Sequence, residues 1–184
     1  MRIVAGKFRG RKLTDSSHLK DLRPTTDKNR EALFNILFSA KFIREMNFEI
    51  NGTTVLDLCC GTGAVAFEAL SRGASQALLV DKNSAHLEVA KKNAQIFGVE
   101  NAVKFLLADA EKLPQSSQIY NFIYIDPPYA YNASQLVQNL VEKNWADKNS
   151  LIVIEAGKDV VTVEGLRLLD SRQYGITRFS FYSL

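Results

Sequence analysis

The architecture of the chain follows from one segment, Thr53-Thr54-Val55-Leu56-Asp57-Leu58-Cys59-Cys60-Gly61-Thr62-Gly63. Its bulky first half predicts a buried strand, and its glycines predict a tight turn into a helix. Gly61 and Gly63 let a ligand approach the backbone closely, and the helix start offers unpaired N–H groups. With Ala66, the spacing fits the Gly-x-Gly-x-x-Gly/Ala fingerprint of nucleotide-binding sheets. The segment therefore predicts the first strand and helix of an α/β fold.

The same alternation of strand and helix continues along the chain. Bulky runs at 76–80, 103–107, 119–125 and 151–155 predict four further strands. Helical spacing predicts helices after Thr25 or Thr26, from about Ser84 to Gly98, and after Asn132. Such alternation is typical of a parallel sheet covered by helices on both faces. The last two runs, 166–171 and 176–183, predict a closing hairpin.

The composition sets the class of protein. A length of 184 residues suits a single domain, which we assign to 1–184. No apolar run approaches the ~20 residues that cross a bilayer, and residues 1–7 lack a signal-peptide core, so we expect a cytoplasmic protein. Cys59 and Cys60 are adjacent and are the only cysteines, which argues against a disulfide framework. With only two histidines besides, we expect no metal site.

Acidic residues lie near the ends of four successive predicted strands: Asp57, Asp81, Asp109 and Asp126. Carboxylates here would repel a diphosphate but attract a cationic amino-acid group. This pattern suits S-adenosylmethionine, with its amino acid and sulfonium near Asp57, its ribose on Asp81 and its adenine near Asp109. A nicotinamide-dependent dehydrogenase is the alternative, but it would explain only the glycines and not Asp57. Each carboxylate also has a structural alternative, because Asp57 could cap the following turn, Asp81 the next helix and Asp109 a loop.

The segment Asp126-Pro127-Pro128-Tyr129 follows the fourth predicted strand. Two prolines exclude helix and ladder pairing and stiffen the loop at the edge of the sheet where ligands bind. A carboxylate and a free carbonyl accept hydrogen bonds from an amine, and an aromatic face stacks on the ring that carries it. The loop therefore predicts a site for a planar base with an exocyclic amine. A rigid turn whose tyrosine merely packs is the alternative.

Positive charge gathers at the amino-terminal end of the chain. Residues 1–30 carry nine basic and three acidic side chains, a net +6, whereas the remaining residues sum to −3. Residues 1–22 predict a basic extension with a hairpin turning near Gly10, which displays Lys7, Arg9, Arg11 and Lys12. This asymmetry indicates a polyanionic partner, most simply nucleic acid. A solvated basic tail is the alternative.

Matching segments spread from end to end then identify a family: 1–13, 23–26, 30–37, 57–63, 68–74, 126–129, Glu155 and 174–175. On these residues the chain resembles the bacterial small-subunit ribosomal RNA (guanine-N2)-methyltransferases, called methyltransferase D. The basic opening segment separates this family from other methyltransferases with an Asp-Pro-Pro-Tyr loop. Cys59, Cys60 and Thr62 depart from the family pattern, which commonly has Phe, a small residue and Ser.

The resemblance implies a class I, Rossmann-like sheet of seven mostly parallel strands with an antiparallel last strand. It implies methyl transfer from S-adenosylmethionine to N2 of one guanine in 16S ribosomal RNA. We expect a monomer that acts on free RNA or on an assembled or partly assembled small subunit. The cofactor would lie on Asp57, Cys59, Gly61, Gly63, Asp81 and Asp109. The amine would bind Asp126 and the Pro127 carbonyl in the loop with Pro128, and Tyr129 would stack on the flipped base.

RNA would meet the basic side chains Lys7, Arg9, Arg11, Lys12, Arg23 and Arg30. Two alternatives to this function remain open. An adenine-N6 methyltransferase uses the same loop chemistry, but sequence-specific DNA binding normally needs a further domain. A non-catalytic RNA-binding module would explain the basic segment but not the acidic strand ends.

Overall fold

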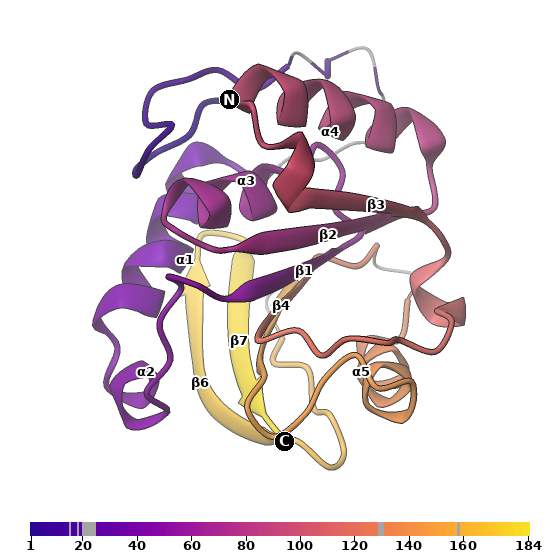
Figure 1. The fold of residues 1–184 in the computed structure, drawn as a ribbon. Coiled ribbons are helices and arrows are strands. Elements are labelled where there is room, and N and C mark those ends of the chain that lie inside the picture. Colours follow the sequence, from indigo (N-terminus) through magenta and orange to yellow (C-terminus); the bar gives the residue numbers. More distant parts are fainter. Residues whose placement is uncertain (15, 18, 20–24, 129–130, 158) are drawn as a thin grey trace.

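A single seven-stranded sheet organises the protein in this computed structural model, which describes residues 1–184 except 15, 18, 20–24, 129–130 and 158 (Figure 1). The strand order is β3-β2-β1-β4-β5-β7-β6. β7 runs antiparallel to both of its neighbours, and the other pairs are parallel. The predicted mostly parallel sheet with an antiparallel last strand is confirmed. The strands are β1 (Thr54–Leu58), β2 (Gln76–Asp81), β3 (Val103–Leu107), β4 (Phe122–Ile125), β5 (Leu151–Ala156), β6 (Arg167–Tyr174) and β7 (Thr177–Ser183).

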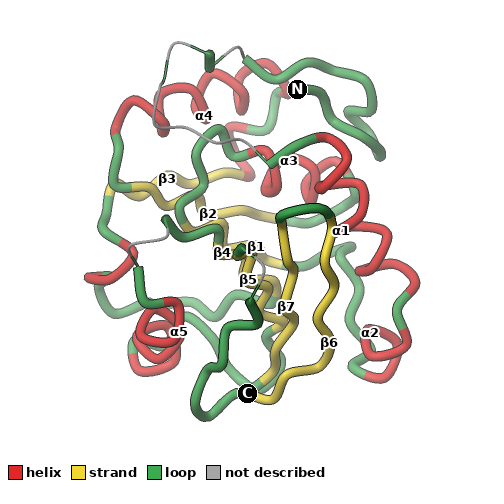
Figure 2. Tube along the Cα trace, turned by 180° about the vertical axis from the view of Figure 1, so that it is seen from behind, coloured by secondary structure: helices red, strands yellow, loops and turns green. Residues whose placement is uncertain are grey.

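Helices cover both faces of the sheet, as predicted (Figures 1 and 2). The first face packs against α1 (Asp27–Ser39), α2 (Lys41–Glu45), α3 (Ala64–Ser71) and α4 (Ser84–Phe97). The second packs against α5 (Ala133–Glu142) and the short 3-10 helix η2 (Ala110–Lys112), whereas the 3-10 helix η1 (Glu100–Ala102) precedes β3. None of the described helices has the length and apolar character that crossing a membrane requires.

Local signals in the sequence set most helix boundaries. The Thr26 hydroxyl accepts a hydrogen bond from the Asn29 amide and caps α1, and Asn132 caps α5 in the same way through Gln135. Gly98, at φ 67°, ends α4 in the left-handed conformation. These three predictions are confirmed. The five-residue α2 was not predicted, because so short a helix shows no periodicity.

The strand register aligns acidic side chains on one face. Asp57 of β1 pairs with Tyr124 of β4, which in turn pairs with Val153 of β5. Asp126 and Glu155 lie two residues beyond Tyr124 and Val153, so they share the face of Asp57 because strand side chains alternate. The three carboxyl groups therefore meet at the carboxyl edge of the sheet, on the face covered by α1 to α4.

The amino-terminal residues fold back on themselves and rest on α3 and α4 (Figure 1). One isolated antiparallel bridge joins Arg2 and Lys12, and turns connect them. The predicted hairpin of two strands is thus reduced to a single bridge. Ile3, Phe8 and Leu13 are buried and anchor this segment in the main core.

Candidate active site

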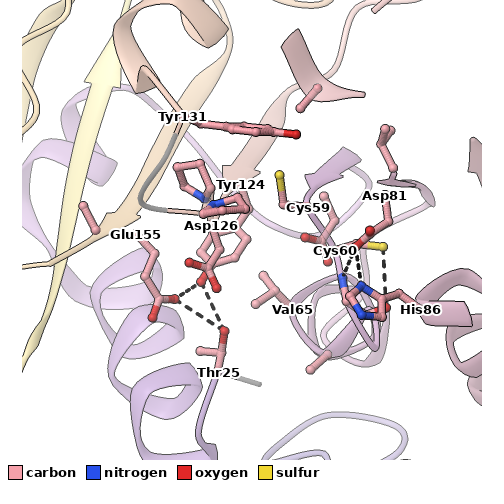
Figure 3. Close-up of a pocket in the computed structure, with 18 of the residues that line it drawn as sticks. Thr25, Cys59, Cys60, Val65, Asp81, His86, Tyr124, Asp126, Tyr131 and Glu155 are labelled. Carbon is pink, nitrogen blue, oxygen red and sulfur yellow. Dashed lines mark hydrogen bonds and ion pairs between the residues drawn. The ribbon is translucent and has the colours of Figure 1, made fainter. Parts of the chain in front are cut away.

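A cavity of about 880 Å³ opens at the carboxyl edge of β1, β2, β4 and β5 (Figure 3). Its volume is in the range of small-molecule and cofactor sites. The glycine loop lies at one end, and the segment after β4 lies at the other. Among its lining residues are four acidic ones: Asp57, Asp81, Asp126 and Glu155. The cavity thus joins the two segments that the sequence assigned to cofactor and to base.

Asp57 is buried beneath the glycine loop. One of its carboxylate oxygens accepts a hydrogen bond from the Ala66 amide at 3.1 Å, so it caps the first turn of α3. Its other oxygen makes no hydrogen bond with a described residue. Burial raises the pKa of Asp57 well above its usual range, and the nearby Asp81 and Glu155 add to this shift. A cation in the cavity would favour the ionised form of this carboxyl group.

The two glycines of the loop serve packing and orientation. Gly63 has φ 74°, which favours glycine, and a Cβ atom there would lie 2.4 Å from Leu79 Cδ2, so a larger residue would strain the backbone and displace the Leu79 side chain. The Gly61 amide donates to Asp81 Oδ2 at 2.9 Å. Gly61 therefore fixes the carboxylate that the sequence assigned to a ribose.

Asp81 is further held by two residues that follow it. Its Oδ1 accepts from the Asn83 amide at 2.9 Å, and its Oδ2 lies 3.2 Å from His86 Nδ1. The Asn83 side-chain oxygen accepts from the Ala85 amide, so its NH2 group faces His86 Nε2 at 3.3 Å. Because that NH2 can only donate, Nε2 is the acceptor and Nδ1 carries the proton. No role was predicted for His86, which orients Asp81 in the wall of the cavity.

Cys59 and Cys60 lie between β1 and Gly61 and both line the cavity. Cys59 adopts φ 58°, a conformation that non-glycine residues rarely take. Burial, together with the surrounding carboxylates, raises the pKa of the Cys59 thiol to about 12. A thiol that stays protonated is a poor nucleophile, so Cys59 contributes shape rather than reactivity.

Asp109 is not among the residues that line the cavity, although its neighbours Ala108 and Ala110 are, and its contact with the cofactor stays a prediction. Its Oδ1 accepts from the Glu111 amide at 3.1 Å and from the Tyr131 hydroxyl at 3.0 Å. The first of these bonds chiefly lowers its pKa. Asp109 thereby holds Tyr131, whose ring closes one side of the cavity (Figure 3).

The segment after β4 lines the cavity and contains acceptors without a described donor. The Asp126 carboxylate and the Pro127 carbonyl make no hydrogen bond with any other described residue, whereas the Pro128 carbonyl accepts from the Tyr131 amide at 2.9 Å. Burial, then the charges of Glu155 and Asp57, raise the pKa of Asp126 well above its usual range. Tyr129 lies outside the described residues, so its stacking role stays a prediction.

Glu155 of β5 completes this end of the cavity, and no role was predicted for it. The Tyr124 hydroxyl donates a short hydrogen bond to Glu155 Oε2, and the Thr25 hydroxyl donates to the same oxygen at 3.4 Å (Figure 3). Burial raises the pKa of Glu155 as well. Glu155 lies near a strand end, as do Asp57, Asp81, Asp109 and Asp126. The sequence signal that identified those four residues could therefore have identified Glu155 as well.

The basic amino-terminal segment exposes Lys7, Arg9, Arg11 and Lys12. Arg11 is the most constrained of these, because its guanidinium lies over the rings of Phe8 and Phe97 at 5.6 and 5.4 Å and donates to the Ile96 carbonyl. Arg9 and Lys12 form no ion pair with a described residue. This display fits the predicted contact with a polyanion.

Two polar residues of α3 hold this segment in place. The carboxylate oxygens of Glu68 accept from the amides of Val4 and Ala5 at 2.8 and 3.0 Å. The Ser71 hydroxyl accepts from the Phe8 amide at 2.9 Å, and its carbonyl accepts from the Lys7 amide at 2.7 Å. The segment is therefore tied to the helix that begins at the glycine loop.

Arg30 corrects one prediction. Its side chain is completely buried, so it does not face RNA. It donates to the carbonyls of Thr25 and Arg2 at 2.7 and 2.6 Å and to Asp27 at 2.8 Å. Five donors in a rigid fork suit such a clamp, which ties the start of α1 to the amino-terminal segment. Arg23 lies outside the described residues, so its RNA contact stays a prediction.

Gly6 offers a test of how closely the basic segment must approach α3. It has φ 79°, and a Cβ atom would lie 1.9 Å from the Ser71 carbonyl oxygen. Gly10 has φ 81°, but a Cβ atom there would meet nothing within 4 Å, so Gly10→Ala is a matched control for backbone strain alone. We expect Gly10→Ala to cost about 1 kcal/mol and Gly6→Ala clearly more, measured by urea unfolding. Equal losses would show that the contact with Ser71 yields at no cost.

Substituting Asp126 tests how much folding free energy is lost by burying carboxyl groups together in the cavity. Since its pKa is raised on folding, the protonated form favours the folded state, and this stabilisation is lost as the pH rises through the folded-state pKa. An asparagine does not titrate, so we expect Asp126→Asn to raise Tm at pH 8 in the absence of ligand. One pKa unit corresponds to about 1.4 kcal/mol, and 1 kcal/mol shifts Tm by about 2–4 °C at this size.

The gain in Tm should shrink as the pH falls toward 5. Scanning calorimetry of both proteins across this range measures it. A gain that is independent of pH would mean that the asparagine acts through packing rather than through charge.

Comparisons with known proteins agree with this geometry. The model of the family described as "Conserved hypothetical protein 95" matches residues 1–183. The ribosomal RNA small subunit methyltransferase D of Haemophilus influenzae is 33% identical over 99% of this chain and 93% of its own length.

Solved structures show the same fold. The putative methyltransferase yhhF from Escherichia coli superposes with a TM-score of 0.79 at 26% identity, covering 99% of this chain and 96% of that one. An S-adenosylmethionine-dependent methyltransferase from Thiobacillus denitrificans, solved with S-adenosyl-L-homocysteine, has a TM-score of 0.58 at 20% identity, over 73% and 50% of the chains. The sheet is thus that of class I methyltransferases, and the chain belongs to the Conserved hypothetical protein 95 family, that of the ribosomal RNA small subunit methyltransferases D.

Proposed function

We propose that this protein transfers a methyl group from S-adenosylmethionine to the exocyclic N2 of one guanine in 16S ribosomal RNA, as a step in small-subunit maturation. The observation that carries the proposal is the pair of open acceptors, the Asp126 carboxylate and the Pro127 carbonyl, at one end of an acidic cavity. Membership of the methyltransferase D family supports the polymer and the reaction class. We propose that a monomer acts, on free RNA or on a partly assembled subunit.

The cavity fits the proposed methyl donor in volume and charge. It is large enough for a nucleoside with an amino-acid tail, and Lys82 is the one lysine or arginine among its described lining residues. Its ammonium lies over the Tyr131 ring, 4.8 Å from the centroid. When bound, S-adenosylmethionine supplies a methyl group already activated on a sulfonium. Asp57 attracts the cationic end of this molecule, and Asp81 is positioned for a ribose hydroxyl.

The base end of the cavity supplies alignment and acceptors. The guanine amine is a weak nucleophile because its lone pair is conjugated with the ring. Hydrogen bonds from its protons to Asp126 and the Pro127 carbonyl draw the nitrogen toward pyramidal geometry and stabilise the charge that develops in the transition state. Alignment of the amine with the methyl carbon supplies much of the remaining acceleration. The methylated amine loses its extra proton after transfer, to the Asp126 carboxylate that accepts its hydrogen bond or to water, so no separate general base is needed.

RNA must present the target base outside its stack. Unstacking costs a few kcal/mol, and we propose that stacking on Tyr129 offsets part of this cost. The exposed side chains of Lys7, Arg9, Arg11 and Lys12 would bind phosphates around the target. Because Glu68 and Ser71 fix this segment on α3, it would meet RNA with little loss of backbone entropy.

The proposal is tested by methyl transfer to small ribosomal subunits from a strain that lacks the gene. Radiolabelled S-adenosylmethionine supplies the label, and digestion to nucleosides followed by chromatography locates it. We expect label in N2-methylguanosine at one position. Label in N6-methyladenosine would mean that the protein is a methyltransferase whose acceptor is adenine rather than guanine. The absence of label from free RNA, subunits and DNA would favour a non-catalytic RNA-binding module.

A further inference from the structure

Glu155 lies beside the proposed amine acceptor and forms no ion pair with any residue that the structure describes. The register of β4 and β5 sets Glu155 next to Asp126 at the edge of the sheet, and both line the cavity. Only 8% of Glu155 is exposed, and no described lysine or arginine pairs with it. Burying an unpaired carboxyl group costs free energy, so a ligand that binds it would offset a penalty already present in the fold.

Hydroxyl groups orient this carboxyl group. Tyr124 and Thr25 donate to its Oε2, and the nearby Thr177 hydroxyl favours its ionised form. The Thr177 hydroxyl is held in turn by the Asn29 amide group at 3.1 Å. A carboxylate offers about four acceptor positions, and the bonds from Tyr124 and Thr25 both use Oε2, so Oε1 has no hydrogen-bond donor among the described residues. The supporting side chains come from different elements: Tyr124 from β4, Thr177 from β7, Asn29 from α1, and Thr25 from just before the α1 cap. Contacts from several elements restrict the orientation of the carboxyl group.

Guanine presents two adjacent donors on its Watson–Crick edge, the N1–H and the N2 amine. Adenine presents an unprotonated N1 beside its amine, and that N1 needs a donor. We propose that Glu155 determines specificity by accepting the N1–H of guanine while Asp126 and the Pro127 carbonyl accept the N2 amine. This inference rests on the proposed function, and it identifies which group on the base the second carboxylate reads.

A supporting role is the competing explanation for Glu155. In that case the carboxylate would only anchor Tyr124, and its loss would weaken methylation of any base that carries the amine. The two explanations differ in whether the base must carry N1–H. 2-Aminopurine keeps the N2 amine of guanine but has an unprotonated N1 and lacks the O6 carbonyl. The loss of O6 is the same for every variant, so a change in base preference when Glu155 is substituted reports recognition of N1–H.

The experiment compares guanine with 2-aminopurine at the position that takes label in the test above. The analogue is introduced by ligation of small-subunit RNA, which is then assembled into subunits, and kcat/KM is measured for each base. We expect the unmodified enzyme to prefer guanine by about 100-fold or more, because a buried acceptor facing an acceptor is left unpaired. In Glu155→Gln, the amide oxygen can still accept from the hydroxyl groups. The NH2 group then donates to the unprotonated N1 of 2-aminopurine and opposes the N1–H of guanine, so the preference for guanine should fall at least about tenfold.

Tyr124→Phe is the matched control, because it removes the hydroxyl that holds Glu155 and leaves the carboxylate. Whatever its effect on the two rates, the ratio between them should stay high. Calorimetric binding of S-adenosylmethionine and thermal unfolding show whether each variant is folded. Equal losses on both bases in Glu155→Gln, or equal rates on both bases in the unmodified enzyme, would overturn the inference and leave guanine-N2 transfer standing. Absence of N2-methylguanosine with the natural subunit would instead overturn the proposed function itself.

Discussion

Replacing Asp126 with alanine is expected to lower kcat for methyl transfer by at least about 10²–10³, the usual cost of removing one preorganised group that stabilises transition-state charge. The variant loses the acceptor that aligns the amine, whereas Asp57, Asp81 and the glycine loop are unchanged. The Kd of S-adenosylmethionine should therefore stay within about twofold. Single-turnover methyl transfer and isothermal calorimetry measure the two quantities separately.

Asp126→Asn serves as the control for this prediction. Its amide oxygen still accepts a hydrogen bond, so its activity should lie between those of the unmodified enzyme and the alanine variant. A parallel loss of cofactor affinity in Asp126→Ala would place this carboxylate on the cofactor rather than on the base. Full activity of the alanine variant would remove Asp126 from the mechanism altogether.

Neutralising Lys7, Arg9 and Lys12 together with glutamine is expected to weaken RNA binding and to flatten its salt dependence. Each phosphate contact contributes about 0.7–0.9 to the slope of log K against log salt, so the slope should fall by about 2–3. Arg11 is left in place because it packs on Phe8 and Phe97. Filter binding of small-subunit RNA between 50 and 200 mM salt, roughly the range in which such effects are large, measures the slope.

The matched control neutralises three exposed lysines that lie away from the basic segment, Lys41, Lys143 and Lys148. It changes the net charge by the same amount and should leave the slope nearly unchanged. If both variants lose the same slope, RNA responds to net charge rather than to this segment. If neither does, the solvated-tail alternative is correct.

Most of the fold was predictable because the decisive signals are local. The Thr26 and Asn132 caps, the Gly98 stop and the run of β-branched residues in β5 each act over a few residues. The antiparallel β7 followed from the departure of the carboxyl-terminal residues from strand–helix alternation. The amino-terminal hairpin was overpredicted, because its apolar residues Ile3, Phe8 and Leu13 are buried against helices rather than in a sheet.

The site was predictable in outline but not in its contacts. Proximity to a strand end placed Asp57, Asp81 and Asp126 at one cavity, since parallel strands share their carboxyl edge. Which atoms of each carboxylate are occupied depends on residues brought near by folding, such as His86 beside Asp81. Arg30 shows most clearly what the sequence leaves open. From the sequence alone, a basic residue that binds backbone carbonyls cannot be distinguished from one that binds phosphate.

Helix α3 connects the proposed methyl-donor site to the basic amino-terminal segment. Its first turn receives the Asp57 cap beside the proposed methyl donor, and its later residues Glu68 and Ser71 hold the basic segment. Eight residues at 1.5 Å each make it about 12 Å long. The spacing from the proposed methyl-donor site to the basic side chains is thus set by a helix rather than by a loop, so the helix would fix how far from the reacting base these side chains meet RNA. Changing its length by one turn would shift that reach by about 5 Å.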